Sequence, residues 1–376
     1  MSLSRIVGQD KAIDLLTSAF DSGRLSHAYL FHGPDGVGKE TTAIEFARAL
    51  NCGTGGLSAC GECKSCRMVE SLSHPDLHLV FPVPGSLKPA ELTELLKSYV
   101  RDGYRDQDFG RKNAIISVEA ILEEVVTRAN QRPYFGPWKV FIIADADMMT
   151  TEAANTLLKT LEEPPDDTVI VLTSSRANAL PATVVSRCQK IPFAGLPEET
   201  IEHILLSEPR FSLDPEGAGR AARLAQGSAG RAVRMEKQGP AVDLDRVASL
   251  MSGDRTRDVA GLINEAHGLA FRLGRTEQQR LLELMLLWYR DVLRVSQTDG
   301  SNGGRGLVYA THLDKLRTQA RGMDVEALGR LVDRLEEARR AIERYSNPTI
   351  VFTSVLLDVA IARKQATKNR SGRHAT

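Results

Sequence analysis

The feature that most constrains the fold of this chain is a glycine-rich turn set directly between a strand pattern and a helix pattern. The turn, Gly33-Pro-Asp-Gly-Val-Gly-Lys-Glu (33–40), fits seven of the eight places of the pattern G-x-x-x-x-G-K-[ST]. A short apolar run over 27–32 precedes it, and a helix-like segment follows over 41–50. This order of strand, glycine turn and helix predicts the opening of an α/β domain.

The residue types of this turn are those that bind phosphate. The backbone can curl so that its N–H groups point toward an anion, because the turn holds three glycines, Gly33, Gly36 and Gly38. Lys39 would reach the β- and γ-phosphates of a nucleotide. Glu40 stands where a Ser or Thr hydroxyl should ligate Mg²⁺, and Thr41 is one place out of register. The residues alone leave open whether ATP with Mg²⁺ binds here, binds weakly or does not bind.

Two further apolar runs are typical of buried strands in the same sheet. They span 139–144 (KVFIIA) and 168–174 (TVIVLTS), and between them a helical segment over 151–161 stops at two prolines. Strands that alternate with helices indicate a parallel sheet covered on both faces. Past about residue 193 only helical patterns continue. We therefore expect an α/β P-loop domain over 1–195, a small helical domain over 196–238 and an all-α domain over 239–376.

The composition fits this layout and excludes several classes of protein. The chain has 376 residues, of which 42% are hydrophobic and 26% charged, so it is neither disordered nor collagen-like. No apolar run approaches the roughly 18 residues of a membrane span, and the N-terminus lacks a signal-peptide pattern. The 48 basic and 48 acidic residues give zero net charge, which argues against a protein that coats nucleic acid with its whole surface. We expect a cytoplasmic location.

An acidic residue ends the 139–144 strand. Four apolar residues and then Asp145 have the form of a Walker B strand, in which Asp145 would help to hold Mg²⁺. An equally good interpretation is an acid at the N-terminus of the next helix. The following residue, Ala146, cannot act as a base that activates water, and Asp147 would point to the wrong side of an extended chain.

Four cysteines lie close together in the pattern C-x7-C-x2-C-x2-C. They are Cys52, Cys60, Cys63 and Cys66, and nothing nearby indicates secretion, so disulfides are not expected. Four thiolates suit a tetrahedral Zn²⁺ at about 2.3 Å from each sulfur. An iron–sulfur cluster is the alternative, but the spacing departs from ferredoxin patterns. We predict a structural zinc module over 52–66, and we expect the distant Cys188 to be a small buried residue.

Arg187 follows a short apolar segment over 183–185 and allows two interpretations. The ordinary one is a surface arginine in a salt bridge. An arginine at the edge of a P-loop domain can also reach the γ-phosphate bound by a neighbouring subunit, as an arginine finger. One residue alone does not decide between them.

Taken in order, these segments resemble the clamp-loader subunits of bacterial DNA polymerase III, a branch of the AAA+ family. The matching text is IVGQ (6–9), HAYLF (27–31), the 33–39 loop, the four cysteines, SHPD (73–76), AANTLLKTLEEPP (153–165), SRC (186–188) and NP (347–348). Each motif is common alone, but the set in this order is specific. The resemblance is dense over 1–235 and thin over 240–376. It explains part of 76–138 poorly, and we expect an irregular insertion within 82–112. A basic, aromatic loop there could contact DNA, but a solvated loop is favoured.

Two types within this family differ in their catalytic residues. The tau/gamma type is the ATPase motor, and the delta-prime type resembles it without hydrolysing ATP. Glu40 and Ala146 replace residues that the motor needs, and Gly230 stands where its sensor arginine would fall, with Arg231 one place on. Arg187, in contrast, is kept. The resemblance therefore implies a delta-prime-type chain.

The resemblance also implies partners and a mechanism. It implies a stator subunit of a hetero-pentamer with tau/gamma and delta subunits, which acts on the sliding clamp and primer–template DNA in the replisome at the nucleoid, with no membrane partner. Arg187 would complete the ATP site of the adjacent tau/gamma subunit, and 239–376 would form a collar. The alternatives are a tau/gamma-type ATPase motor and, less favoured, an unrelated P-loop enzyme with a zinc lid.

Overall fold

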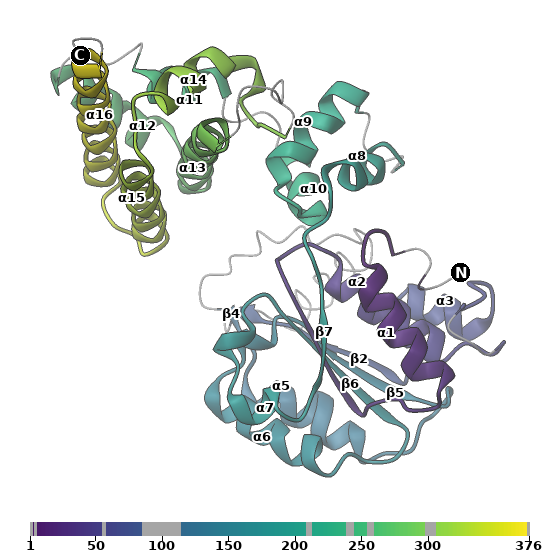
Figure 1. Ribbon diagram of the computed structural model, residues 1–376. Helices are drawn as coiled ribbons and strands as arrows, with labels where there is room; N and C mark the ends of the chain where they lie inside the picture. The colour runs from purple at the N-terminus through teal and green to yellow at the C-terminus, as the bar shows by residue number, and fades with distance from the viewer. Residues whose placement is uncertain are drawn as a thin grey trace. The chain divides into compact units, whose positions relative to one another are not determined.

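The chain forms two compact units, Met1–Lys237 and Gln238–Thr376 (Figure 1). The computed structural model describes residues 3, 6–54, 58–84, 114–207, 213–237, 244–253, 259–297 and 306–373. The insertion expected at 82–112 therefore lies almost entirely outside the described residues. The first unit holds an α/β domain followed by three short helices, and the second unit is helical.

A five-stranded parallel sheet with the order β2-β5-β6-β1-β7 forms the centre of the α/β domain. Its strands are β1 (Ala28–His32), β2 (Leu77–Val80), β5 (Lys139–Ile143), β6 (Thr168–Ser174) and β7 (Gln189–Pro192). The three strands expected from apolar runs are confirmed, and so is the α/β fold class. The sequence analysis did not anticipate β2 and β7, the two edge strands. A separate pair, β3 (Val83–Pro84) and β4 (Ala114–Ile115), is antiparallel.

Helices cover both faces of this sheet (Figure 1). One face carries α1 (Asp10–Asp21), α2 (Lys39–Leu50) and α3 (Lys64–Glu70), and the other carries α5 (Val118–Ile121), the π-helical η2 (Leu122–Thr127), α6 (Thr151–Glu162) and α7 (Ala182–Val185). Successive side chains of a strand point to opposite faces, so in β1 Tyr29 and Phe31 pack under α1 and α2 while Ala28 and Leu30 pack under α6. This two-sided burial explains why the central strands are continuously apolar.

The small helical part of the first unit has a core of its own. It consists of α8 (Glu198–Ser207), α9 (Pro215–Ala225) and α10 (Ala229–Lys237), which enclose mainly alanine and leucine side chains. Asp214 caps α9, because its Oδ1 accepts a hydrogen bond from the N–H of Gly217 at 2.8 Å. The N–H of Leu196 donates to the carbonyl oxygen of Gly227 at 2.8 Å, which ties the entry of this part to the turn before α10.

The second unit is built around its longest buried helix. Its elements are α11 (Leu244–Ser252), α12 (Val259–Arg272), α13 (Arg275–Gln297), η5 (Ala310–His312), α14 (Leu313–Ala320), α15 (Val325–Glu343) and α16 (Pro348–Arg373). Trp288 of α13 is fully buried, and its indole N–H donates to Gln319 Oε1 at 2.8 Å. Gln319 Nε2 in turn donates to the carbonyl oxygen of Met251 at 2.6 Å, which links α11, α13 and α14.

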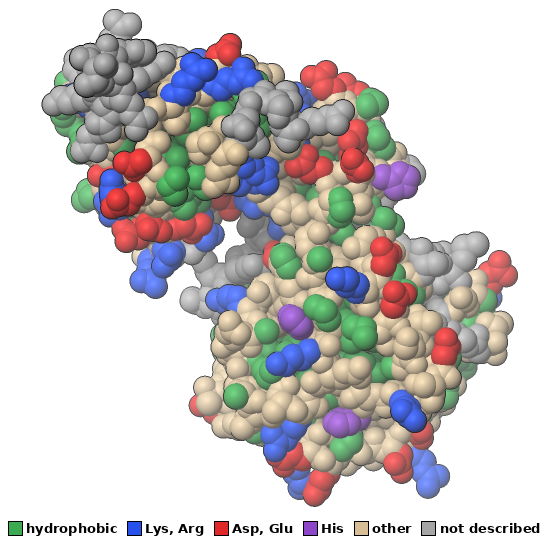
Figure 2. Space-filling view, in the orientation of Figure 1, with side chains coloured by type: hydrophobic (Ala, Val, Ile, Leu, Met, Phe, Trp, Pro, Cys, Tyr) green, Lys and Arg blue, Asp and Glu red, His purple; other side chains and the backbone are tan. Residues whose placement is uncertain are grey.

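The surface and the helices agree with the composition. On the face drawn in Figure 2, basic and acidic side chains are interspersed over both units, as expected from equal numbers of the two. Among the helices that the structure describes, none is long and apolar enough to cross a membrane.

Candidate functional site

The glycine turn joins β1 to α2 at the C-terminal edge of the sheet. A Cβ added at Gly33 would lie 2.2 Å from the backbone oxygen of Phe193, so only glycine permits this close approach. Gly36 and Gly38 have φ angles of 70° and 100°, in the region that favours glycine. The backbone therefore curls as expected of a phosphate-binding loop.

Lys39, the first residue of α2, is directed at the loop itself. Its side chain is only 1% exposed, and its Nζ donates to the carbonyl oxygens of Gly33 at 3.1 Å and Pro34 at 2.7 Å. Thr41 lies partly buried in the same turn, while the hydroxyl of Thr42 donates to the carbonyl oxygen of Gly38 at 2.8 Å. The loop's own carbonyls thus satisfy the ammonium group that would otherwise bind phosphate.

Glu40 is joined to the neighbouring strands by a short chain of hydrogen bonds. The hydroxyl of Thr173, near the end of β6, donates to Glu40 Oε1 at 2.6 Å, and it accepts from the backbone N–H of Asp145 at 3.1 Å. In P-loop NTPases the loop hydroxyl and the strand aspartate jointly hold Mg²⁺. Here a carboxylate–hydroxyl bond connects the same elements directly. The sequence analysis missed Thr173, although its polar position at the end of an apolar strand beside β5 was a usable signal.

The two acidic residues after β5 occupy a turn rather than an extended chain. Asp145 has φ 48°, so the chain enters the short helix η3 (Ala146–Met148) at once, and its buried side chain makes no capping hydrogen bond. Asp145 thus stands as an acid at the N-terminal end of η3, while Thr150 provides the side-chain cap of α6. The turn also brings Asp147 back to β6, where it accepts from Ser174 Oγ at 2.8 Å and Arg176 Nε at 2.9 Å. The expected extended position of Asp147 is therefore wrong.

The small helical part rests on the glycine turn through backbone contacts. The N–H of Gly230 donates to the carbonyl oxygen of Gly36 at 2.9 Å. A Cβ added at Gly36 would lie 2.4 Å from Ser228 Oγ, and one at Gly230 would lie 3.0 Å from Gly36 Cα. Arg234 and Asp35 form an ion pair at 3.5 Å. Two glycines thus let the start of α10 lie directly against the loop.

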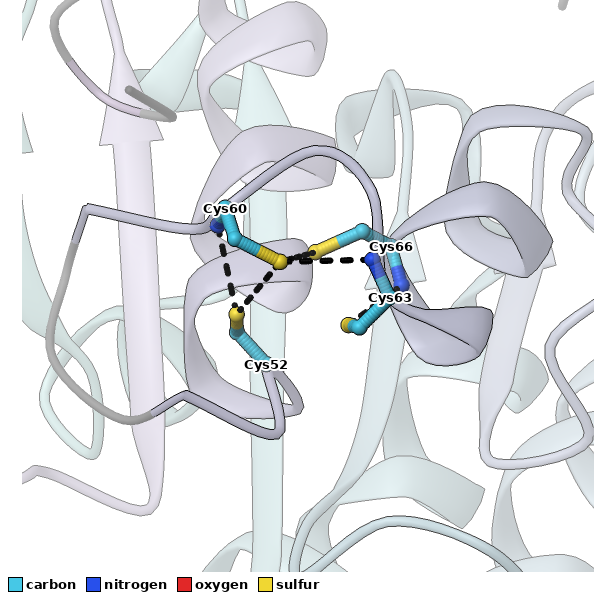
Figure 3. A group of neighbouring side chains, drawn as sticks. All are labelled: Cys52, Cys60, Cys63 and Cys66. Carbon is cyan, nitrogen blue, oxygen red and sulfur yellow. Dashed lines mark hydrogen bonds between the residues drawn. The ribbon is translucent and has the colours of Figure 1, made fainter.

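The four cysteines come together just beyond the C-terminal end of α2 (Figure 3). Their sulfur atoms all lie within 4.8 Å of one another. Cys60 Sγ lies 3.7 Å from Cys52 Sγ and 3.9 Å from Cys66 Sγ. Sulfurs placed tetrahedrally about 2.3 Å from a metal would be about 3.8 Å apart, so the cluster fits a four-thiolate metal site. Backbone N–H groups of Cys60, Cys63 and Cys66 donate to the sulfurs of Cys52, Cys60 and Cys63, which orients these ligands.

The thiols in this cluster have pKa values that differ widely. For Cys52, burial opposes ionisation, but hydrogen bonds from Thr54 and from the Cys60 N–H outweigh it and lower the pKa to about 6. For Cys66, burial and the neighbouring thiols raise the pKa to about 12. A divalent metal would stabilise all four thiolates together. Cys188 is outside the cluster and buried, and burial raises its pKa to about 12, so the expectation of a small buried residue is confirmed.

Arg187 lies just after α7 and is held by two acceptors of its own chain. Its Nη2 lies 2.5 Å from Glu162 Oε1, and its Nη1 donates to the carbonyl oxygen of Thr183 at 2.8 Å. The side chain is still 34% exposed, and a guanidinium group has five N–H donors, so donors remain for another acceptor. The surface ion pair expected for Arg187 is therefore present, and Glu162 is a partner that the sequence analysis did not name.

The predicted site residues fall at three separate places. The glycine turn, Glu40 and Asp145 meet at the C-terminal edge of the sheet. Arg187 lies two residues before β7, which runs parallel to β1, so it lies at the opposite edge of the sheet. The cysteine cluster lies beyond α2. A nucleotide at this chain's own loop would thus be remote from its own Arg187.

Comparisons with known proteins agree with the predicted family. A family model described as DNA polymerase III, delta subunit, matches residues 8–197, half of the chain. DNA polymerase III subunit delta′ of Bacillus subtilis is 32% identical over 76% of this chain and 78% of its own length. DNA polymerase III subunit tau of Escherichia coli is 30% identical over 62% of this chain, which spans only 32% of that longer protein.

The solved structures that match this chain are less similar to it. A gamma-subunit-related protein of DNA polymerase III from Thermotoga maritima covers 95% of this chain and 100% of its own, with 16% identity and a TM-score of 0.37. The family assignment rests on the family model and on the Bacillus subtilis relative, whose match extends past the α/β domain. The chain therefore belongs to the clamp-loader subunit family of DNA polymerase III and is similar to its delta-prime subunits.

Proposed function

We propose that this chain is a delta-prime-type stator of the clamp loader, which does not hydrolyse ATP itself but completes the ATP site of a neighbouring subunit. The hydrogen bond between Glu40 and Thr173 carries this proposal. It places a carboxylate where a motor subunit has a metal-binding hydroxyl. That carboxylate would repel polyphosphate instead of helping to hold the Mg²⁺ that neutralises it.

Two more features support a catalytically inactive loop. Ala146 directly follows Asp145 and offers no base to orient an attacking water. Gly230 lies against Gly36 where the motor type carries its sensor arginine, so no cation from that position can reach a phosphate. ATP and Mg²⁺ have no productive role at 33–40 in this proposal.

Arg187 is the catalytic group that the chain would supply. Its planar guanidinium can donate to the γ-phosphate oxygens bound by the adjacent tau/gamma subunit, where negative charge develops during transfer. Arginine fingers contribute about 10³-fold or more to hydrolysis in related systems. The position of Arg187 at the sheet edge opposite its own loop suits a role in trans.

Zinc is the metal proposed for the four-cysteine cluster. The ligand set contains only thiolates in a tetrahedral spacing, which Zn²⁺ prefers in structural sites. Cys52, Cys60, Cys63 and Cys66 would fill all four positions, so none remains for a reacting water. The metal would supply folding stability to 52–66 rather than catalysis.

The proposed assembly uses the three parts of the chain differently. Residues 1–195 would form the P-loop body that contacts a neighbouring subunit, 196–238 the lid, and 239–376 the collar of a hetero-pentamer. Tau/gamma and delta subunits, the sliding clamp and primer–template DNA are the proposed partners, in the cytoplasmic replisome at the nucleoid.

The test is ATP hydrolysis with and without the partners. The purified chain should not hydrolyse ATP, and Arg187→Ala in a reconstituted assembly should lower DNA-stimulated hydrolysis strongly while the assembly still forms. Arg176→Ala is the matched control, because Arg176 is an exposed arginine ion-paired with Asp147 beside the chain's own loop. Unchanged hydrolysis with Arg187→Ala would overturn the proposal.

The retained glycine turn and Lys39, together with the similarity to subunit tau, make the ATPase motor the second candidate. That candidate requires hydrolysis by the chain or its homo-oligomer that is lost with Lys39→Ala. An unrelated P-loop enzyme would show neither co-assembly with a sliding clamp and tau/gamma nor a role for Arg187.

A further inference from the structure

Residues 131–138, called here the aromatic loop, expose two large rings directly before β5. Tyr134 is 85% exposed and Phe135 is 43% exposed. The proposed mechanism uses neither residue, and both lie at the sheet edge opposite the glycine turn. Exposed aromatic residues are a common core of protein contacts when the backbone that carries them is rigid.

A buried carboxylate fixes the backbone of this loop. Asp76, in the turn before β2, is only 3% exposed. Its Oδ1 accepts from the N–H of Tyr134 at 2.6 Å, and its Oδ2 accepts from the N–H groups of Phe135 at 2.7 Å and Gly136 at 2.8 Å. Three consecutive N–H groups bound to one carboxylate hold the two exposed residues in a single conformation.

Further buried side chains fix both ends of the loop. Lys139 is 4% exposed, and its Nζ donates to the carbonyl oxygens of Ala129 and Gln131. Asn51 Oδ1 accepts from the N–H of Trp138 at 3.0 Å. A Cβ added at Gly136 would lie 2.0 Å from Asn51 Oδ1, so glycine is needed for this contact. A cation and an amide thus complete the support begun by Asp76.

The cysteine cluster contributes to the same surface. Lys64 lies between Cys63 and Cys66, and its Nζ is 5.1 Å from the ring centroid of Phe135. The ring of His74 meets Phe135 edge-on at 5.7 Å. Contacts with the His74 ring and with the Lys64 ammonium group therefore orient the Phe135 ring. The Tyr134 ring remains exposed.

Burying charged groups is costly unless their hydrogen bonds are satisfied, and here the satisfied bonds support a loop that itself buries little. The free-energy cost of burying these groups is explained if the loop must hold its two rings in a fixed geometry. We propose that Tyr134, Phe135 and Lys64 form a docking surface for another protein of the assembly, one that offers an apolar pocket for the tyrosine ring and an acidic rim for Lys64 and Arg132. That the partner is a protein of this assembly rests on the proposed function.

The local charge favours a protein over a nucleic acid. Lys64 lies beside Phe135, and Arg132 is an exposed cation of the aromatic loop itself. The segment that carries Lys64 also exposes Arg67 and the acids Glu62 and Glu70. Single-stranded nucleic acid binds where aromatic platforms lie in a continuous positive groove. Mixed charges around a central aromatic anchor are instead typical of the polar rim of a protein interface.

The test uses the full chain with purified tau/gamma subunit, delta subunit and sliding clamp. With p-benzoylphenylalanine incorporated in place of Tyr134, irradiation of the assembly should cross-link the chain to one of these proteins. Tyr134→Ala should raise the Kd for that protein at least tenfold, and Tyr134→Phe less than threefold. Leu122→Ala, at another exposed apolar residue of the same unit, is the matched control and should change nothing.

Three results would overturn the docking surface. One is normal assembly without a cross-link, and another is a Tyr134→Ala chain that binds like wild type. The third is a Tyr134→Ala chain that binds a fluorescent single-stranded oligonucleotide more weakly than wild type but binds the proteins equally well, which would assign the loop to nucleic-acid binding. If the wild-type chain joins none of the three proteins, the proposed function fails as well, and native-mass measurement of the assembly separates that outcome from the others.

Discussion

Replacing Asp76 with asparagine tests how strongly the aromatic loop is held. The asparagine side chain has the same shape, but only one of its two terminal atoms can accept a hydrogen bond. If its oxygen takes the place of Oδ2, the bonds from Phe135 and Gly136 remain, and the amide nitrogen faces the N–H of Tyr134. Asp76→Asn therefore removes one bond and sets two donors against each other.

The cost follows from these contacts. An unsatisfied, partly buried donor costs about 1–3 kcal/mol, and the two remaining bonds weaken by roughly 1 kcal/mol in total because the acceptor loses its charge. We expect Asp76→Asn to lower the free energy of unfolding of the first unit by about 2–4 kcal/mol. For a unit of this size, each kcal/mol corresponds to about 2–4 °C in Tm, so the loss is roughly 5–15 °C.

Tryptophan fluorescence can follow the first unit alone. The chain has two tryptophans; Trp138 ends the aromatic loop and Trp288 lies in the second unit, so a Trp288→Phe background leaves only the reporter of interest. Urea unfolding in this background should show an earlier transition for Asp76→Asn. Asp166→Asn, at an exposed aspartate, should shift stability by less than about 0.5 kcal/mol. Equal midpoints for Asp76→Asn and wild type would refute the assigned role of the carboxylate.

Three further predictions concern the four-cysteine cluster, Arg187 and pH. If the cluster holds the proposed zinc, chelation or Cys60→Ser should release it and lower the Tm of the first unit by several degrees, as measured by metal analysis and fluorescence melting. Glu162→Gln should raise hydrolysis by the assembly at subsaturating ATP by at most about fivefold, because an exposed ion pair that competes for Arg187 is worth no more than about 1 kcal/mol. Glu163→Gln is the control. Reduced activity with Glu162→Gln would contradict a competing role for Glu162. Burial lowers the pKa of His78 in the folded chain. Below the ordinary pKa of about 6.5 the unfolded chain therefore takes up a proton that the folded chain does not, and the free energy of unfolding should fall from pH 7 to pH 5. Urea titrations at several pH values should show a smaller fall in the free energy of unfolding for His78→Leu.

Local pattern was sufficient for the centre of the fold. The runs 139–144 and 168–174 are apolar because their strands are buried on both faces, and the helix between them ends before two prolines, as α6 does. The edge strands were missed for the opposite reason. In β7 only Ile191 is buried, so its four residues carry no apolar run, and β2 is half exposed along its middle.

Contacts between distant segments could not be predicted in the same way. Asp76 binds N–H groups 58 to 60 residues further along the chain, and Glu40 binds a hydroxyl 133 residues away. The clustering of the four cysteines was predictable because all four lie within one short segment of the chain. Asp147 was misplaced because one left-handed residue, Asp145, turned the chain before the expected strand could continue.

In the proposed function this chain has no motor chemistry of its own, and the contacts around the glycine turn determine what restoring that chemistry would require. Glu40 does more than replace a hydroxyl, because its carboxylate accepts a hydrogen bond from the hydroxyl of Thr173. The same hydroxyl accepts a hydrogen bond from the backbone N–H of Asp145. Gly230 is likewise not merely a missing arginine, because its small size lets its N–H reach the carbonyl oxygen of Gly36. A serine at position 40 alone would leave Thr173 without its acceptor and still provide no base at Ala146. Under the proposed function, hydrolysis at this loop would therefore require at least positions 40, 146 and 230 to change together, which agrees with the proposed role of Arg187 at the ATP site of a neighbouring subunit.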